Sequence, residues 1–285
     1  MHILAILPQR VVVAFSRASA WLMWQSNARI RKVTEGNIAI CFPDLPDDER
    51  TQLVRNSLYE LNMCIFELGR SWMWKPERLE AKITRVVGMD IWRAAIAAGK
   101  GTVMLVPHLG NWELTSIYLG KDHPLTILYR EPKRTGLGDI VRHARERRGA
   151  KLVSGGSSGV RSLLKALKTG GVVTILPDQV PPISSGEFAP FFGESTLTMT
   201  LVTNLIQRTG ANAVCCYCKR LPYGEYELVF REVDQDLYSA DCDTALAGLN
   251  KSVERCVRDC PEQYQWQYKR FKFLPNMEKR DYGDS

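Results

Sequence analysis

Apolar and polar positions follow two different periods along the middle of the chain. Short apolar runs, typical of buried strands, occur at residues 102–106, 125–129, 172–176, 213–218 and 226–231. Segments with apolar residues at helical spacing lie between most of them, at residues 112–119, 137–147, 159–168 and 198–208. Strands that alternate with helices predict an α/β fold with a mixed, largely parallel sheet flanked by helices.

Both ends of the chain also contain predicted helices. Before Pro76, apolar residues recur at roughly helical spacing, at Leu53, Leu58, Leu61, Ile65 and Leu68. A last amphipathic helix is predicted at residues 243–259, before a basic and aromatic tail that would suit a lipid headgroup interface. We therefore expect a helical N-terminal segment over residues 1–75 and an α/β domain over residues 76–285.

The N-terminal segment begins with apolar stretches that Arg10 and Arg17 interrupt. No uninterrupted apolar run approaches the roughly 20 residues that a helix needs to cross a bilayer. Trp21 and Trp24 near an arginine favour a helix that lies in the plane of a membrane interface, so this segment is predicted to associate with a membrane. The alternative is a helix that only packs on the rest of the domain.

The composition is that of a globular protein with a basic surface. Of 285 residues, 45% are hydrophobic and 24% are charged, which excludes a disordered chain. Lys and Arg number 38 against 31 Asp and Glu, giving a net charge of +7. An excess of that size suits an anionic partner, such as a membrane surface, an acidic carrier protein or nucleic acid, although many soluble enzymes are equally basic.

The eight cysteines raise the question of a metal site. Cys215 and Cys218 form a Cys-x-x-Cys pair, a spacing found in zinc sites. The pair lies within a run that predicts a buried strand, where the two side chains would point to opposite faces and act as small hydrophobic groups. We therefore predict no metal. We also expect reduced thiols, because the sequence begins with no convincing cleavable signal peptide.

Candidate chemistry lies directly after the first apolar run. His108 stands at the predicted carboxyl end of that strand, and Glu113 follows five positions later at the start of a helix. Open α/β sheets bind ligands outside the carboxyl ends of their strands, and a histidine oriented by a carboxylate can act as a general base. Gly110 permits a tight turn, and Asn111 is expected to cap the helix. The alternative for His108 is an ordinary polar residue at a strand end.

Two more strand ends carry polar residues. Arg130 follows the second apolar run, and Asp178 and Gln179 follow the third. A parallel sheet would bring these residues to the same edge as His108, where Asp178 could hold a substrate hydroxyl or an arginine, or only serve a turn. Arg145 lies on a basic helix, which is either a solvated face or a site that recognises phosphate.

Four blocks of sequence, in this order, resemble the bacterial late lipid A acyltransferases of the lysophospholipid-acyltransferase superfamily. They are Pro-His-Leu-Gly-Asn-Trp-Glu at residues 107–113, Tyr-Arg-Glu-Pro at 129–132, Pro-Asp-Gln at 177–179 and Pro-Phe-Phe-Gly at 190–193. A terminal block at residues 260–272 is also similar, although Tyr268 replaces the family's His. Glu113 favours this branch, because the glycerol-phosphate branch usually carries Asp at that place.

The resemblance implies an O-acyltransferase at the cytoplasmic face of a bacterial inner membrane. A fatty acyl group would pass from acyl carrier protein, or from coenzyme A, to a hydroxyl of a lipid A precursor, with no cofactor, metal or nucleic acid involved. His108 would be the general base and Glu113 would orient it. Arg145, Arg130 or the backbone near Gly110 would stabilise the oxyanion. Substrate-binding roles are implied for Asn111, Arg130, Asp178, Gln179, Phe191 and Phe192.

Two other functions are compatible with the residues alone. An acyltransferase of this kind could act on another glycolipid or on an aminolipid. A basic protein could instead bind membranes or nucleic acid without catalysis, although a histidine–glutamate pair at a strand end has no purpose in such a protein.

Overall fold

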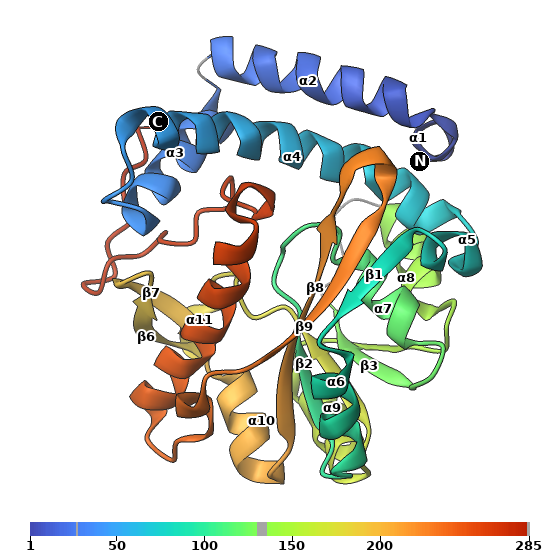
Figure 1. Cartoon of the computed structure of the whole chain (residues 1–285). Coiled ribbons are helices and arrows are strands. Elements are labelled where there is room, and N and C mark those ends of the chain that lie inside the picture. Colours follow the sequence, from blue (N-terminus) through green and yellow to red (C-terminus); the bar gives the residue numbers. More distant parts are fainter. Residues whose placement is uncertain (27, 130–135, 284–285) are drawn as a thin grey trace.

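A seven-stranded sheet forms the centre of the computed structural model, which describes residues 1–26, 28–129 and 136–283 (Figure 1). In order across the sheet, the strands are β1 (Ile83–Val87), β9 (Tyr226–Glu232), β8 (Asn212–Arg220), β2 (Thr102–Leu105), β5 (Val172–Ile175), β3 (Leu125–Leu128) and β4 (Lys151–Val153). The strands from β8 to β4 are parallel, whereas β9 runs antiparallel to β8 and parallel to β1. The predicted α/β fold with a mixed, largely parallel sheet is confirmed.

Helices cover both faces of the sheet, and side chains alternate between the two along β2. Val103 and Leu105 belong to one apolar core, together with residues of α9 (Ser157–Lys168), α10 (Leu201–Thr209) and α11 (Cys242–Asp259). Met104 and Val106 belong to the other core, together with residues of α5 (Pro76–Glu80), α6 (Met89–Ala97) and α7 (Glu113–Leu119). Both faces of this strand are buried because helices pack on each side, which is typical of parallel sheets.

The cysteines of β8 follow the same alternation. Cys215 lies in the core with α11, and Cys218 lies in the core with α7, so the predicted opposite orientations are confirmed. Burial raises the pKa of the Cys218 thiol well above its ordinary value. A neutral buried thiol behaves as a small apolar side chain in such a core.

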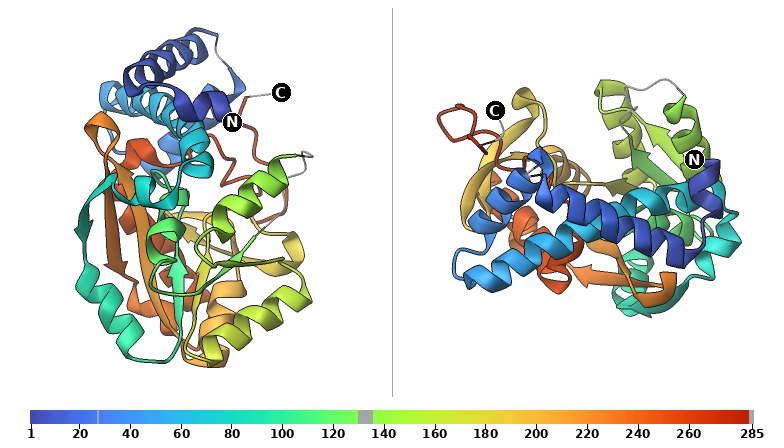
Figure 2. Two further views of the ribbon diagram at one scale, coloured as in Figure 1. Left: turned by 90° about the vertical axis from the view of Figure 1, so that its right-hand side faces the viewer. Right: turned by 90° about the horizontal axis from the view of Figure 1, so that it is seen from above.

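The first four helices form a layer over one end of the sheet (Figures 1 and 2). They are α1 (His2–Ile6), α2 (Gln9–Gln25), α3 (Arg29–Cys41) and α4 (Asp47–Met73). Ile38 of α3 and Leu58 of α4 belong to the same apolar core as Leu105 of β2, so this layer is packed on the sheet. Asn111, which follows β2, hydrogen bonds to Glu67 of α4, so α4 lies beside the carboxyl end of β2.

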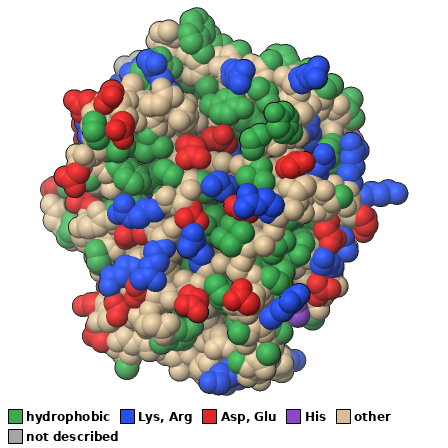
Figure 3. Space-filling view, in the orientation of Figure 1, with side chains coloured by type: hydrophobic (Ala, Val, Ile, Leu, Met, Phe, Trp, Pro, Cys, Tyr) green, Lys and Arg blue, Asp and Glu red, His purple; other side chains and the backbone are tan. Residues whose placement is uncertain are grey.

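Helix α2 has one face that packs on the rest of the protein and one face that is exposed. Ser16 and Ala20 are buried, whereas Phe15, Trp21 and Leu22 are more than half exposed. Hydrophobic side chains are interspersed with Lys and Arg over the top of the molecule, where α2 lies (Figure 3). In the described ranges, no helix combines the length and the apolar character needed to span a bilayer.

The tail after α11 was expected to suit a lipid headgroup interface, but several of its side chains are buried. Trp266, Arg270 and Phe271 are all buried. The Arg270 guanidinium donates to the carbonyl of Leu197 at 2.6 Å and to the hydroxyl of Thr198 at 3.0 Å, so protein groups replace its solvent. The prediction of a headgroup interface is therefore wrong for these side chains, because the tail folds back into the domain.

A small hairpin stands apart from the main sheet. It consists of β6 (Gly186–Phe191) and β7 (Glu194–Met199), which pair in antiparallel register. The Pro-Phe-Phe-Gly block at residues 190–193 completes β6 and forms the turn to β7. The remaining helix, α8 (Leu137–Glu146), lies close to α7, β4 and α4.

Candidate active site

The turn between β2 and α7 carries His108 and Glu113 at its two ends. Gly110 has φ of +60°, and a Cβ at this position would collide with the carbonyl oxygen of Cys218. The backbone N–H of Gly110 donates to the carbonyl of Gln263 at 3.1 Å, and that of Asn111 donates to the carbonyl of Cys218 at 2.8 Å. The predicted need for glycine in this turn is confirmed, and the turn is held between β8 and the tail.

Asp178 is the carboxylate that binds His108. Its Oδ1 lies 2.8 Å from His108 Nδ1, and its Oδ2 accepts the His108 backbone N–H at 2.8 Å. The two residues meet because β5 is the direct neighbour of β2, with Leu105 opposite Ile175. Burial alone would raise the pKa of the Asp178 carboxyl, but the charge and hydrogen bonds of His108 outweigh burial and lower it. Asp178 is therefore an ionised carboxylate at neutral pH.

This pairing determines which nitrogen of His108 can accept a proton. A carboxylate only accepts hydrogen bonds, so Nδ1 carries the hydrogen and Nε2 carries the lone pair. The side-chain nitrogen of Gln179 lies 3.3 Å from Nε2 and donates to it. The His108 side chain is 15% exposed, and its ring packs edge-on against Trp112 at a centroid distance of 5.2 Å. Nε2 is thus the basic atom of the site.

Glu113 is bound by Arg145 instead of His108. Arg145 Nε donates to Glu113 Oε2 at 3.0 Å, and Arg145 Nη2 donates to Oε1 at 2.5 Å. Burial favours the neutral acid, but Arg145 outweighs it and the pKa of Glu113 is lowered. The expectation that Glu113 orients the His108 ring differs from this geometry: α7 directs the Glu113 carboxylate to α8, and the neighbouring strand end supplies the carboxylate of His108. Glu113 remains close enough for the charge of His108 to help lower its pKa.

Asn111 is buried beneath the turn, where it is only 3% exposed. Its side-chain nitrogen donates to Ser71 Oγ at 3.1 Å and lies 3.4 Å from both Glu67 Oε2 and Tyr226 OH. The predicted helix cap is wrong, because the N-cap of α7 is Trp112 and its side chain makes no capping hydrogen bond. The tertiary contacts to α4 and β9 take up the Asn111 side chain instead. Its predicted substrate contact stays a prediction.

A buried ion pair extends this polar cluster. Arg220, at the end of β8, donates through Nε and Nη2 to the two carboxylate oxygens of Glu67, with each distance at 2.9 Å, and it also binds Glu60. Arg220, Glu67 and Glu60 were not among the predicted site residues. The apolar pattern gave no signal for them, since Glu67 falls between the apolar positions of α4 and Arg220 follows the apolar run of β8.

The remaining predicted site residues lie in different surroundings. Phe191 is buried in the core, and Phe192 packs on Phe42 at a centroid distance of 5.2 Å. Arg130 lies outside the described residues. Tyr268, the position that departs from the family's His, accepts the backbone N–H of Val180 at 3.0 Å and so lies beside the segment that carries Gln179.

The comparisons with known proteins agree with this architecture. A family model described as bacterial lipid A biosynthesis acyltransferase matches residues 1–273. A lipid A biosynthesis lauroyltransferase of Escherichia coli (strain K12) is 29% identical over 271 residues, covering 94% of this chain and 88% of the relative. A lipid A biosynthesis palmitoleoyltransferase of the same strain is 28% identical over 249 residues, covering 87% and 80%. The resemblance and the predicted enzyme class, an acyltransferase, are thereby confirmed. The chain belongs to the bacterial lipid A biosynthesis acyltransferase family.

Proposed function

We propose that this protein transfers a fatty acyl group from a thioester, carried by acyl carrier protein or coenzyme A, to a hydroxyl of a lipid A precursor. The observation that carries this proposal is the His108–Asp178 pair, which leaves the basic Nε2 of a mostly buried histidine at the carboxyl edge of a parallel sheet. The names of the relatives, lauroyltransferase and palmitoleoyltransferase, support a lipid A acceptor and a fatty acyl donor.

His108 acts as a general base in the proposed reaction. An alcohol is a weak nucleophile at neutral pH, so Nε2 removes its proton as the oxygen attacks the thioester carbonyl carbon. The carbon–oxygen bond forms, and the carbonyl electrons move to the oxygen as an oxyanion. When the oxyanion collapses, the carbon–sulfur bond breaks and the thiolate takes the proton from His108. Asp178 stabilises the imidazolium that exists between these steps.

Arg145 is the proposed oxyanion donor. Its Nε and one Nη2 hydrogen are directed at Glu113, which holds the guanidinium plane in one orientation. The remaining N–H groups of the fork are then available to a developing negative charge. In this mechanism Glu113 acts on Arg145 and, through its charge, on the His108 imidazolium. Arg130 and the backbone near Gly110 are alternative donors, and Gln179 would give way to the acceptor hydroxyl at Nε2.

The proposed location is the cytoplasmic face of a bacterial inner membrane. The exposed apolar face of α2, with Phe15, Trp21 and Leu22, supports contact with the interfacial region of a bilayer. The net charge of +7 suits both an anionic membrane surface and an acidic carrier protein. Phe191 and Phe192 are proposed to contribute to the region that receives the acyl chain.

The decisive experiment offers the purified protein a mixture of lauroyl, myristoyl and palmitoleoyl donors together with a tetra-acylated lipid A precursor. Parallel reactions use acyl carrier protein and coenzyme A thioesters, and mass spectrometry identifies the product. We expect the wild type to add one acyl group to the precursor, and we expect His108→Ala to form far less of this product. Equal product with both proteins, or none with either type of donor, would refute the proposal.

A further inference from the structure

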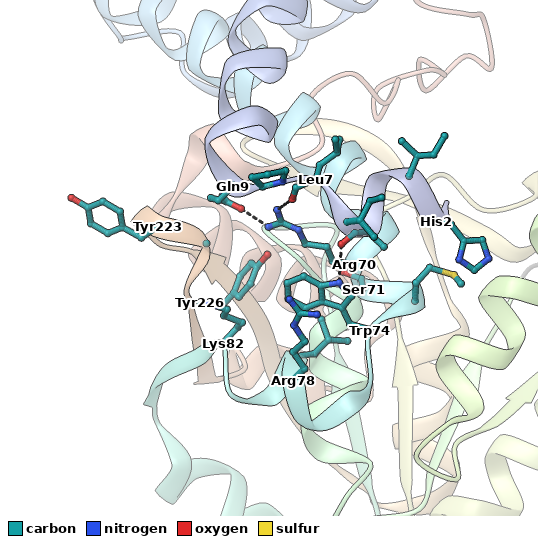
Figure 4. Close-up of a pocket in the computed structure, with 17 residues that line it drawn as sticks. His2, Leu7, Gln9, Arg70, Ser71, Trp74, Arg78, Lys82, Tyr223 and Tyr226 are labelled. Atoms are coloured by element: carbon teal, nitrogen blue, oxygen red, sulfur yellow. Dashed lines mark hydrogen bonds between the residues drawn. The ribbon is translucent and has the colours of Figure 1, made fainter.

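A cavity lies beside the cluster of side chains that binds Asn111. It has a volume of about 750 Å³ and is enclosed by α1, the ends of α2 and α4, α5 and the turn Pro222–Gly224 between β8 and β9 (Figure 4). Ser71 and Tyr226 line this cavity and also bind Asn111, whose side chain is buried. His108, Asp178 and Gln179 are absent from its described lining, so the cavity is separate from the proposed catalytic groups.

The lining combines apolar side chains with positive charge. The apolar wall includes Ile3, Ile6, Pro8, Met73, Trp74 and Leu79. Arg70, Arg78 and Lys82 also line the cavity, and its described lining contains no acidic side chain. An apolar cavity that contains only cationic charge is complementary to an amphiphile with an anionic head.

Two of these cations, Arg70 and Arg78, have different roles in the cavity. Arg70 is buried and joins α4 to the start of α2, since it donates to the carbonyl of Leu7 at 2.5 Å and to the side chain of Gln9 (Figure 4). Its Nε is buried and has no hydrogen-bond partner in the described part of the chain. The Arg78 guanidinium is stacked over Trp74, 3.5 Å from the ring centroid, which leaves its N–H edge exposed to a ligand.

The rim of the cavity is apolar and exposed. Ile3 and Ile6 are 73% and 79% exposed, and Tyr223 is 91% exposed. Tyr223 points outward from the β8–β9 turn in Figure 4. Free phosphate would gain nothing from such a rim, whereas lipid chains would cover it.

From these observations we infer that the cavity binds an anionic phospholipid as an accessory ligand. Arg78 and Lys82 hold the headgroup phosphate, and the acyl chains lie along α1 and the apolar wall. This lipid is not the molecule that is acylated, because the described lining of the cavity does not include His108. The inference does not depend on the acyl-transfer reaction, and it can be tested by binding alone.

The test is photo-crosslinking of the full-length protein in phosphatidylcholine vesicles that contain a minor fraction of phosphatidylglycerol with a diazirine in its acyl chain. Peptide mapping locates the label. We expect label concentrated in residues 2–9 and 70–82, and a fall of about 10-fold there in R78E/K82E, since two charge-assisted contacts are lost. R78Q/K82Q tests the same contacts with a smaller change and is expected to lower the label in the same direction.

The matched control is K165E/K168E, which makes the same change of charge on two exposed lysines of α9. It should label as the wild type does. The inference fails if the control loses label equally, if a phosphatidylcholine probe labels the same residues as strongly, or if the label is spread evenly over the chain. Complete displacement by inorganic phosphate would show a simple anion site and would also overturn it.

Discussion

His108 Nδ1 and Asp178 Oδ1 lie 2.8 Å apart, and they come from the ends of two adjacent parallel strands. The second oxygen of the same carboxylate accepts the His108 backbone N–H. A carboxylate that binds both the ring and the backbone of one histidine restrains the rotation of the imidazole and selects the tautomer with a basic Nε2. The pairing of β2 with β5 therefore determines the orientation of the His108 ring.

Asp178→Asn should therefore impair turnover more than it impairs substrate binding. The amide preserves the shape but removes the charge that stabilises imidazolium and can favour the wrong tautomer. We expect kcat to fall by about 100- to 10,000-fold with a smaller change in KM. Steady-state kinetics at saturating donor measure this, with the exposed Asp243→Asn as the control. A kcat within a few-fold of wild type would exclude Asp178 from the mechanism.

Arg145→Lys distinguishes two roles for the arginine that Glu113 holds. Lysine keeps the charge but loses the planar fork, so an oxyanion donor should lose about 100- to 1000-fold in kcat with little change in KM. A residue that recognises a lipid phosphate should instead raise KM for the acceptor and leave kcat largely intact. We expect the first pattern. Wild-type values for both constants would assign Arg145 only to the ion pair.

Acid should destabilise the protein through the carboxyls of Glu113 and Asp178. Burial alone would raise both pKa values. Arg145 outweighs burial at Glu113, and His108 outweighs it at Asp178, so both folded-state pKa values are lowered. The unfolded state then binds more protons, and the stability from these groups is complete above about pH 5 and is lost as pH falls through the folded pKa values. Urea midpoints measured between about pH 3 and pH 7 should fall steeply on the acid side. The fall should be shallower in Glu113→Gln, and an identical profile would contradict the assignment.

Glu67→Leu should destabilise the protein strongly, because it leaves the buried Arg220 charge without its bidentate carboxylate. We expect a loss of about 3–5 kcal/mol in the free energy of unfolding. The double variant E67L/R220M should be less destabilised than E67L, since the buried guanidinium is removed together with its carboxylate and the remaining partner, Glu60, is 14% exposed to solvent. Denaturant unfolding of the three proteins tests this, and additive losses would show that the pair is not coupled.

The outer face of α2 should control membrane association. Replacing Phe15, Trp21 and Leu22 by serine removes exposed apolar area without disturbing the buried face, so the fold should survive while vesicle binding weakens at least about 10-fold. Ile183→Ser with Val87→Ser is the control, since both side chains are apolar and exposed elsewhere. Co-sedimentation with anionic vesicles measures the effect. Equal binding by all three proteins would remove α2 from the interface.

The local pattern of the sequence determined much of this fold. Each of the five predicted apolar runs is a strand, and the alternation along β8 places Cys215 and Cys218 in different cores. The two edge strands β1 and β4 escaped prediction because they are short and partly exposed and have no continuous apolar run. Local periodicity encodes which face a side chain takes, and a strained turn such as that at Gly110 requires a particular residue.

Only the tertiary structure decided which groups meet. His108 lies five residues from Glu113 in the chain, yet it binds Asp178, 70 positions away, because β5 is the strand beside β2. Asn111 could cap a helix by its local sequence, but Glu67 and Ser71 of α4 bind its side chain. Long-range packing also buries Trp266, Arg270 and Phe271 of the tail. Strand order and helix docking are set by long-range packing, and spacing along one sequence does not specify which neighbour a polar group will find.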